Sequence, residues 1–69
     1  MASLILDKIF TYHAPKGDQP ERYVALREKG KALAELVESV CPDSREKSLA
    51  ITSIQQAIMW ANASIAINE

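Results

Sequence analysis

The sequence is poor in the residues that stabilise small proteins through covalent or metal cross-links. Cys41 is the only cysteine and His13 is the only histidine. A single cysteine excludes an intrachain disulfide, and one cysteine and one histidine far apart do not supply a structural zinc site. The core of a chain of 69 residues rarely contributes more than ~3–5 kcal/mol without such a staple. Self-association is the remaining means of stabilisation, and we therefore expect an oligomer.

Charge is also absent from a long stretch, although 25% of the residues are charged. The 21 residues from Ser48 to Asn68 carry no charged side chain, and a stretch of this length can cross a bilayer. Three serines, one threonine, two glutamines and two asparagines within it argue against a membrane span, because each would need a partner in the hydrocarbon. The stretch therefore predicts a helix covered by protein on most sides. Only one other long helix is available to cover it, which again indicates an oligomer.

Motifs of catalysis and cofactor binding are missing as well. The chain has no glycine-rich phosphate loop, Walker motif, HExxH or CxxC. His13 could pair only with Cys41 or a serine, and nothing orients such a pair, so we expect no enzymatic activity, no metal and no cofactor. The net charge of −1 gives no broad basic surface for duplex nucleic acid or an anionic membrane. The first ten residues lack the charged region of a signal peptide, and we expect a soluble cytoplasmic protein.

The residues that are present predict an all-α fold with one domain over residues 1–69. A short helix is expected at 3–10, followed by a loop that holds two prolines and a glycine. Longer helices are expected at 19–40 and 44–67, because apolar residues recur there at helical spacing. The two long helices would form an antiparallel helical hairpin.

The expected helix starts carry capping residues. Ser3 is the predicted N-cap of the short helix, and Asp18 or Gln19 that of the second helix. The third helix is predicted to begin with a capping box, in which Asp43 is the acidic cap and Glu46 stands at the third helical position.

Apolar seams follow both long helices. The seam on the second helix comprises Tyr23, Leu26, Gly30, Leu33, Val37 and Val40. The seam on the third comprises Ile51, Ile54, Ile58, Ala61 and Ile65. Their spacing of three and four is typical of paired helices. Gly30 costs ~1 kcal/mol of helix propensity, which a close helix crossing or a ligand near the backbone would explain. Leu49, Trp60, Ala63 and Ile67 form a second stripe, where we expect subunits to pack.

Two regions have the composition of an anion or nucleotide site. Arg45 and Lys47 stand in the first turn of a helix, where positive charge opposes the helix dipole but suits a phosphate. The alternative is that Asp43 and Glu46 neutralise both cations in solvent.

Tyr12 and His13 lie in the loop between Lys8 and Lys16. An aromatic ring flanked by cations suits a stacked nucleobase with its phosphate held nearby. The alternative is that Tyr12 folds back, with the preceding phenylalanine, as an apolar anchor on the hairpin. Arg27 could bind the same anion or pair with a neighbouring glutamate.

Two segments carry a resemblance to a known family. Residues 10–34 (FTYHAPKGDQPERYVALREKGKALA) and residues 44–66 (SREKSLAITSIQQAIMWANASIA) resemble the phage anti-CBASS sponges, which share a helical hairpin domain with the phage anti-Thoeris sponges. FTYHAPK and the SRE-K-SLA and MWANA parts are the most specific. The chain departs from its relatives at Ile67 and Asn68, where they tend to have a basic residue.

The resemblance implies a non-catalytic phage protein that acts in the host cytoplasm. It implies a compact helical homohexamer that binds cyclic oligonucleotide second messengers and withholds them from CBASS-type effectors without cleaving them. Cyclic dinucleotides would occupy pockets between paired subunits, and cyclic trinucleotides separate pockets where three subunits meet.

Positions carried over from the resemblance give the expected contacts. Arg45 would contact a cyclic trinucleotide, together with Thr11. Tyr12 would stack on a base of a cyclic dinucleotide, and the phosphate contact would come from Lys8, His13 or Arg27. An alternative function that the sequence leaves open is a non-catalytic helical oligomerisation or protein-interaction module.

Overall fold

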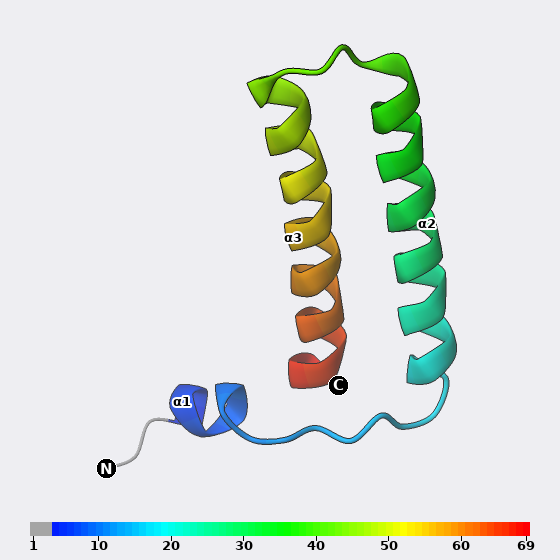
Figure 1. Cartoon of the computed structure of the whole chain (residues 1–69). Coiled ribbons are helices and arrows are strands. Elements are labelled where there is room, and N and C mark those ends of the chain that lie inside the picture. Colours follow the sequence, from blue (N-terminus) through cyan, green and yellow to red (C-terminus); the bar gives the residue numbers. More distant parts are fainter. Residues whose placement is uncertain (1–3) are drawn as a thin grey trace.

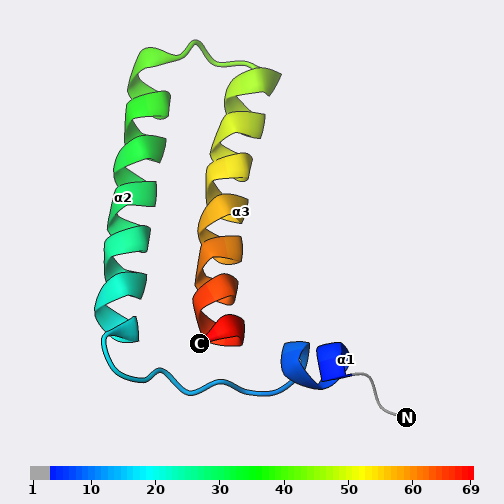
Figure 2. The same cartoon turned by 180° about the vertical axis from the view of Figure 1, so that it is seen from behind.

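A computed structural model of the chain describes residues 4–69 and contains three helices. They are α1 (Leu4–Ile9), α2 (Gln19–Val40) and α3 (Arg45–Asn68). Figure 1 shows that α2 and α3 run antiparallel as a hairpin, and that α1 lies beside its open end. The view from behind shows the same arrangement, with the segment between α1 and α2 passing under that end (Figure 2). The all-helical hairpin is thus confirmed, whereas the predicted cap Ser3 lies outside the described residues.

The start of α2 follows from the residues at its first turn. Gly17 has a φ of 58°, a left-handed conformation that glycine adopts without steric cost. Pro20 stands in the first turn, where its missing N–H would have had no helical partner in any case. Asp18 occupies the N-cap position without a capping hydrogen bond, and its carboxylate lies 3.2 Å from the Arg22 guanidinium instead.

The capping box predicted at the start of α3 is wrong by one residue. Ser44 is the N-cap in an extended conformation, and its Oγ accepts a hydrogen bond of 3.1 Å from the Lys47 backbone N–H. Asp43 is not the cap because its carboxylate contacts the Lys47 ammonium at 3.0 Å. Glu46 therefore stands at the second helical position rather than the third, and Arg45 at the first.

The predicted seam on α3 is confirmed, since all five of its residues are half-buried. On α2 two predicted seam residues are wrong: Leu33 and Val40 are 50% and 66% exposed. Ala34 and Cys41 are half-buried in their place. The reason is the helical period of 3.6, because a step of four rather than three residues follows Gly30 and turns the contact face accordingly.

Gly30 marks the closest approach of the two helices. A Cβ atom at this position would lie 2.7 Å from Cγ1 and 2.9 Å from Cδ1 of Ile58. Of the two explanations for a glycine on the seam, the close helix crossing is confirmed.

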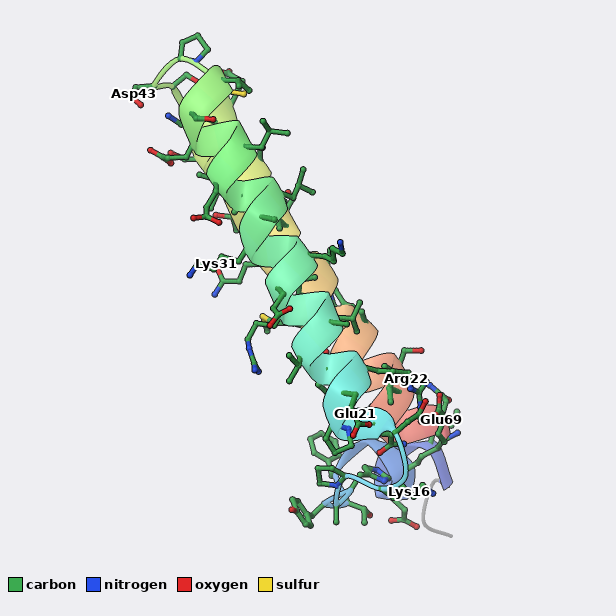
Figure 3. All side chains as sticks on the ribbon, turned by 90° about the vertical axis from the view of Figure 1, so that its right-hand side faces the viewer. Lys16, Glu21, Arg22, Lys31, Asp43 and Glu69 are labelled. Carbon is green, nitrogen blue, oxygen red and sulfur yellow. The ribbon has the colours of Figure 1, made fainter. Side chains whose placement is uncertain are left out.

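The hairpin encloses no core of its own. Among the described residues no hydrophobic side chain is buried, and the Cα extents of 50 × 29 × 12 Å describe a flat plate. Figure 3 shows this plate edge-on, with α2 in front of α3. On the second stripe Leu49 is 50% and Trp60 75% exposed. Although residues 48–68 carry no charged side chain, α3 is not long and apolar enough to span a membrane, and neither is any other helix in residues 4–69.

Gly30→Ala tests the close crossing. An alanine gains ~1 kcal/mol of helix propensity, but overpacking at Ile58 costs about 1–3 kcal/mol. We expect a net loss on the order of 1 kcal/mol and hence a lower melting temperature in a circular dichroism melt. Adding Ile58→Val, which removes Cδ1, should make the double variant more stable than the sum of the two single changes predicts. A melting temperature that rises in Gly30→Ala would contradict the crossing.

Candidate ligand-binding site

A cluster of polar side chains at the open end of the hairpin is centred on Glu69. Arg22 of α2 grips this carboxylate with both terminal nitrogens, Nη1 donating to Oε2 at 2.8 Å and Nη2 to Oε1. Gln19, only 3% exposed, donates from Nε2 to Oε1 at 3.4 Å. Figure 3 shows Arg22, Glu69 and Lys16 gathered at this end. We call Gln19, Arg22 and Glu69 the end clasp, because they tie the first turn of α2 to the C-cap residue of α3.

The charges of the end clasp stabilise one another. The hydrogen bonds from Arg22, and then those from Gln19, lower the pKa of Glu69 to about 2. The same contact raises the pKa of Arg22 above its ordinary value, with a smaller contribution from Asp18. A bidentate guanidinium–carboxylate pair has the strongest geometry for a charge-assisted hydrogen bond.

The segment before α2 is docked onto the end clasp and onto α3. The Lys16 backbone N–H donates to Gln19 Oε1 at 3.1 Å, and the Lys16 ammonium donates to the Glu69 carbonyl at 2.7 Å. The Lys8 ammonium donates to Asn68 Oδ1 at 3.1 Å. These three contacts hold the N-terminal segment across the hairpin end.

Tyr12 stands free beside this docked segment. Its ring is 83% exposed and the preceding Phe10 81% exposed, so the alternative in which they anchor the segment on the hairpin is wrong. A pocket of about 320 Å³ opens beside the ring. It is lined by Tyr12, His13, Ala14, Lys16, Gln19, Ala66, Ile67 and Glu69.

Lys8 retains unneutralised charge at this end of the hairpin. Its ammonium donates to the amide oxygen of Asn68 and has no carboxylate within 4.0 Å among the described residues. Lys16, by contrast, donates to the Glu69 backbone oxygen, and its charge helps to lower the pKa of the Glu69 carboxyl. An exposed ring with nearby cations is the arrangement that holds a stacked base and its phosphate.

The other N-terminal candidates have local partners. His13 Nε2 lies 2.8 Å from the Lys8 carbonyl oxygen, which can only accept, so Nε2 carries the proton in this contact. The Thr11 hydroxyl donates to the Asp7 carbonyl. Both contacts shape the turn after α1 and thereby help to place the Tyr12 ring.

Arg27 is not part of the Tyr12 pocket. It is exposed and lines a separate hollow with Tyr23, Asn62, Ala63 and Ala66. It forms no ion pair with a described residue, so the predicted pairing with a neighbouring glutamate is wrong. Within one chain, Arg27 and Tyr12 do not line one pocket.

Arg45 lies at the opposite end of the molecule. It is the first residue of α3, exposed, and without an ion pair among the described residues. The 24 residues of α3 span roughly 36 Å, so Arg45 and Tyr12 of one chain cannot touch the same small ligand. The predicted neutralisation of both cations by Asp43 and Glu46 is confirmed only for Lys47 with Asp43, at 3.0 Å. The second acid beside Lys47 is Glu38, at 3.4 Å, and not Glu46.

The sequence reading missed the end clasp. The spacing of four between Asp18 and Arg22 is a recognised signal for an ion pair on a helix surface, and it could have been used. No such signal exists for Arg22 and Glu69, which lie 47 positions apart.

Comparison with known protein families gives a match over most of the chain. The family model described as "Acb2/Tad1, hairpin domain" matches residues 3–66. No curated protein and no solved structure matches the chain.

Glu69→Gln tests the end clasp through its pH dependence. Because the pKa of Glu69 is lowered from 4.5 to about 2 in the folded chain, its stabilising effect is complete above pH 4.5 and is lost as the pH falls toward 2. Wild type should therefore melt at a higher temperature than Glu69→Gln at pH 6, and the difference should vanish near pH 2. Glu21→Gln is the matched control, because Glu21 lies in the same turn of α2 as Arg22 and has no ion pair with a described residue. An equal effect of both variants would contradict the clasp.

Proposed function

We propose that this chain, which belongs to the Acb2/Tad1 hairpin-domain family of anti-CBASS and anti-Thoeris sponges, binds cyclic oligonucleotide second messengers and withholds them from a bacterial immune effector. It would act in the cytoplasm of a phage-infected host, on CBASS-type signals, and release its ligand unchanged. The single observation that carries the proposal is the family match over residues 3–66. Two features of the structure support it independently.

The first feature is the Tyr12 pocket. Tyr12 would stack on a base of a cyclic dinucleotide, since stacking on an aromatic ring contributes about 1–3 kcal/mol per base. Lys8 would hold a phosphate, because its ammonium is not neutralised by a carboxylate. His13 lines the same pocket, and Arg27 would reach the ligand only from a second subunit.

The second feature is the unpaired Arg45 at the far end of the hairpin. A guanidinium at a helix N-terminus adds its charge to the free backbone N–H groups there, and both suit a phosphate. We assign Arg45 to a cyclic trinucleotide. Thr11 follows α1, which lies at the open end of the hairpin, away from the start of α3 (Figure 1), so it would share that ligand only as a residue of another subunit.

We propose a homo-oligomer, specifically a hexamer, and the exposed apolar faces support this proposal. No hydrophobic side chain of the described residues is buried, and burial of apolar surface against further copies contributes roughly 25 cal/mol per Å². Trp60 and Leu49 are the largest exposed residues of the second stripe and would lie between subunits. Pockets between subunits would then complete both ligand sites.

The mechanism is stoichiometric sequestration. A phosphate that enters a pocket loses water, and charge-assisted hydrogen bonds from arginine or lysine must replace that water. Because several subunits build each pocket, ligand binding would stabilise the assembly.

A capture-and-release experiment tests the function. Purified protein is incubated with a panel of cyclic di- and trinucleotides, freed of unbound ligand and digested, and the released ligand is chromatographed. We expect intact ligand in stoichiometric amounts. Cleaved ligand would show an enzyme, and the absence of any ligand would favour the alternative of a protein-interaction module, to which the exposed Trp60 would also be suited.

Two substitutions test the site residues. Tyr12→Ala should weaken cyclic dinucleotide binding by about 5- to 150-fold, from the loss of one stacked base, whereas Tyr12→Phe should stay close to wild type. Arg45→Ala should weaken cyclic trinucleotide binding by roughly 10- to 100-fold, from the loss of a charge-assisted contact, and leave dinucleotide binding unchanged. Titration calorimetry measures both. Unchanged affinities for every cyclic oligonucleotide would refute the site assignment.

Trp60→Glu tests the assembly. A charge on the second stripe would have to be desolvated between subunits, which a buried interface does not tolerate without a partner. We expect light scattering to show a smaller species than wild type, while Trp60→Phe, which keeps an apolar ring, retains the wild-type mass. An unchanged mass in Trp60→Glu would place the interface elsewhere.

A further inference from the structure

Lys47 is the one buried charged side chain among the described residues, with 8% of its side chain exposed. Its ammonium donates to the Glu38 carbonyl at 2.8 Å and to the Asp43 carboxylate at 3.0 Å. The Glu38 carboxylate lies 3.4 Å away. One side chain of α3 therefore satisfies a carbonyl in the last turn of α2 and neutralises two acids at the corner of the hairpin.

The two acids keep Lys47 charged. The hydrogen bond with Asp43, followed by that with Glu38, raises the pKa of the ammonium above its ordinary value, although burial opposes this shift. The cluster is therefore a permanent feature of the corner at neutral pH rather than a titrating switch.

Arg45 lies two residues before Lys47 and shows the opposite situation. It is exposed and has no carboxylate within 4.0 Å among the described residues. Asp43 lies two residues before Arg45 in the sequence. Its side chain is 97% exposed, and its carboxylate contacts Lys47. If Lys47 did not hold it, this carboxylate would be free to turn toward the guanidinium.

We propose that Lys47 is a positioning residue of the Arg45 site, because it engages Asp43 and so keeps the Arg45 guanidinium available to an anionic ligand. The inference rests on the proposed function in one respect, namely that Arg45 binds a phosphate of a cyclic oligonucleotide. An ion pair between Arg45 and Asp43 would compete with that phosphate, since the guanidinium offers its paired donors to either group. The ion pair between Lys47 and Asp43 thus prevents Asp43 from neutralising Arg45.

Lys47→Met tests this role by titration calorimetry with cyclic tri-adenosine monophosphate. We expect its affinity to fall about three- to fivefold, the factor that corresponds to one exposed ion pair formed in competition. Asp43→Asn added to Lys47→Met should restore the affinity to near wild type. Asp43→Asn alone should change little, because Lys47 already holds that carboxylate in the native protein.

Two controls separate this role from a general effect of charge. Lys47→Met with Glu46→Gln has the same net charge as the rescued double variant but leaves Asp43 free, so it should stay weak. Lys31→Met removes a positive charge that has no ion pair among the described residues, and it should bind as wild type does. Equal rescue by Glu46→Gln, or full affinity in Lys47→Met, would overturn the proposal.

If Lys47→Met loses helical content, Lys47→Gln replaces it in the experiment. The glutamine amide can still donate to the Glu38 carbonyl and so preserve the corner, but it carries no charge to hold Asp43. The same affinities and the same rescue by Asp43→Asn are then expected.

A readout without ligand separates this inference from the proposed function. The nuclear magnetic resonance signal of the Arg45 Nε–H group should shift in Lys47→Met and return in the double variant with Asp43→Asn. If wild type does not bind the cyclic trinucleotide, the assignment of that ligand to Arg45 fails, and this signal still decides whether Lys47 keeps the guanidinium unpaired. An unmoved signal in Lys47→Met would refute that role.

Discussion

The seam between α2 and α3 is the contact on which the rest of the structure depends. At Gly30 the helices approach so closely that a Cβ atom would lie within 3 Å of Ile58. Two helices share only one such line of contact, and every other face of each helix remains open. That geometry explains why a chain in which 48% of residues are hydrophobic buries no hydrophobic side chain among those described. The proposed homo-oligomer would cover these faces with further copies of the chain.

Polar contacts secure both ends of this seam. At the open end Arg22 binds Glu69 and joins the first turn of α2 to the last residue of the hairpin. At the closed end Lys47 binds Asp43 and the end of α2. In each of these contacts a cation of one helix binds an acceptor at the end of the other helix. The ion pairs thereby hold α2 and α3 together at the ends of the hairpin, as apolar packing holds them together in the middle.

The cations of the chain differ in whether a carboxylate of the same chain neutralises them. Arg22 and Lys47 are neutralised internally, whereas Lys8 and Arg45 have no carboxylate partner among the described residues. The proposed function needs the second group, because a buried phosphate requires positive charge that is not already paired. Lys8 and Arg45 lie at opposite ends of a thin plate, which supports the proposal of two kinds of pocket that an assembly completes.

Periodicity and local chemistry were sufficient for the helices and the seam on α3, because these depend on residues within a few turns of one another. The two apolar seams also predicted the hairpin. They marked Gly30 as a place of close approach but did not decide between the other helix and a ligand. Local chemistry also identified Tyr12 and Arg45 as unusual, since an exposed-loop aromatic between lysines and a cation at a helix start are visible as patterns. Two local features differed from expectation. Leu33 and Val40 are exposed because a step of four residues follows Gly30, and the N-cap is Ser44 because the start of α3 is shifted by one residue.

What the sequence by itself determined is therefore the set of helices, the stripe of apolar residues that each one carries and the two segments rich in candidate contacts. Only the tertiary structure decided which cations are neutralised. Arg22 meets Glu69 across 47 positions and Lys47 reaches back to Glu38 on the other helix, and neither pairing leaves a local pattern. The physical reason is that an ion pair depends on distance in space, which the antiparallel return of the chain sets and the spacing of residues along it does not.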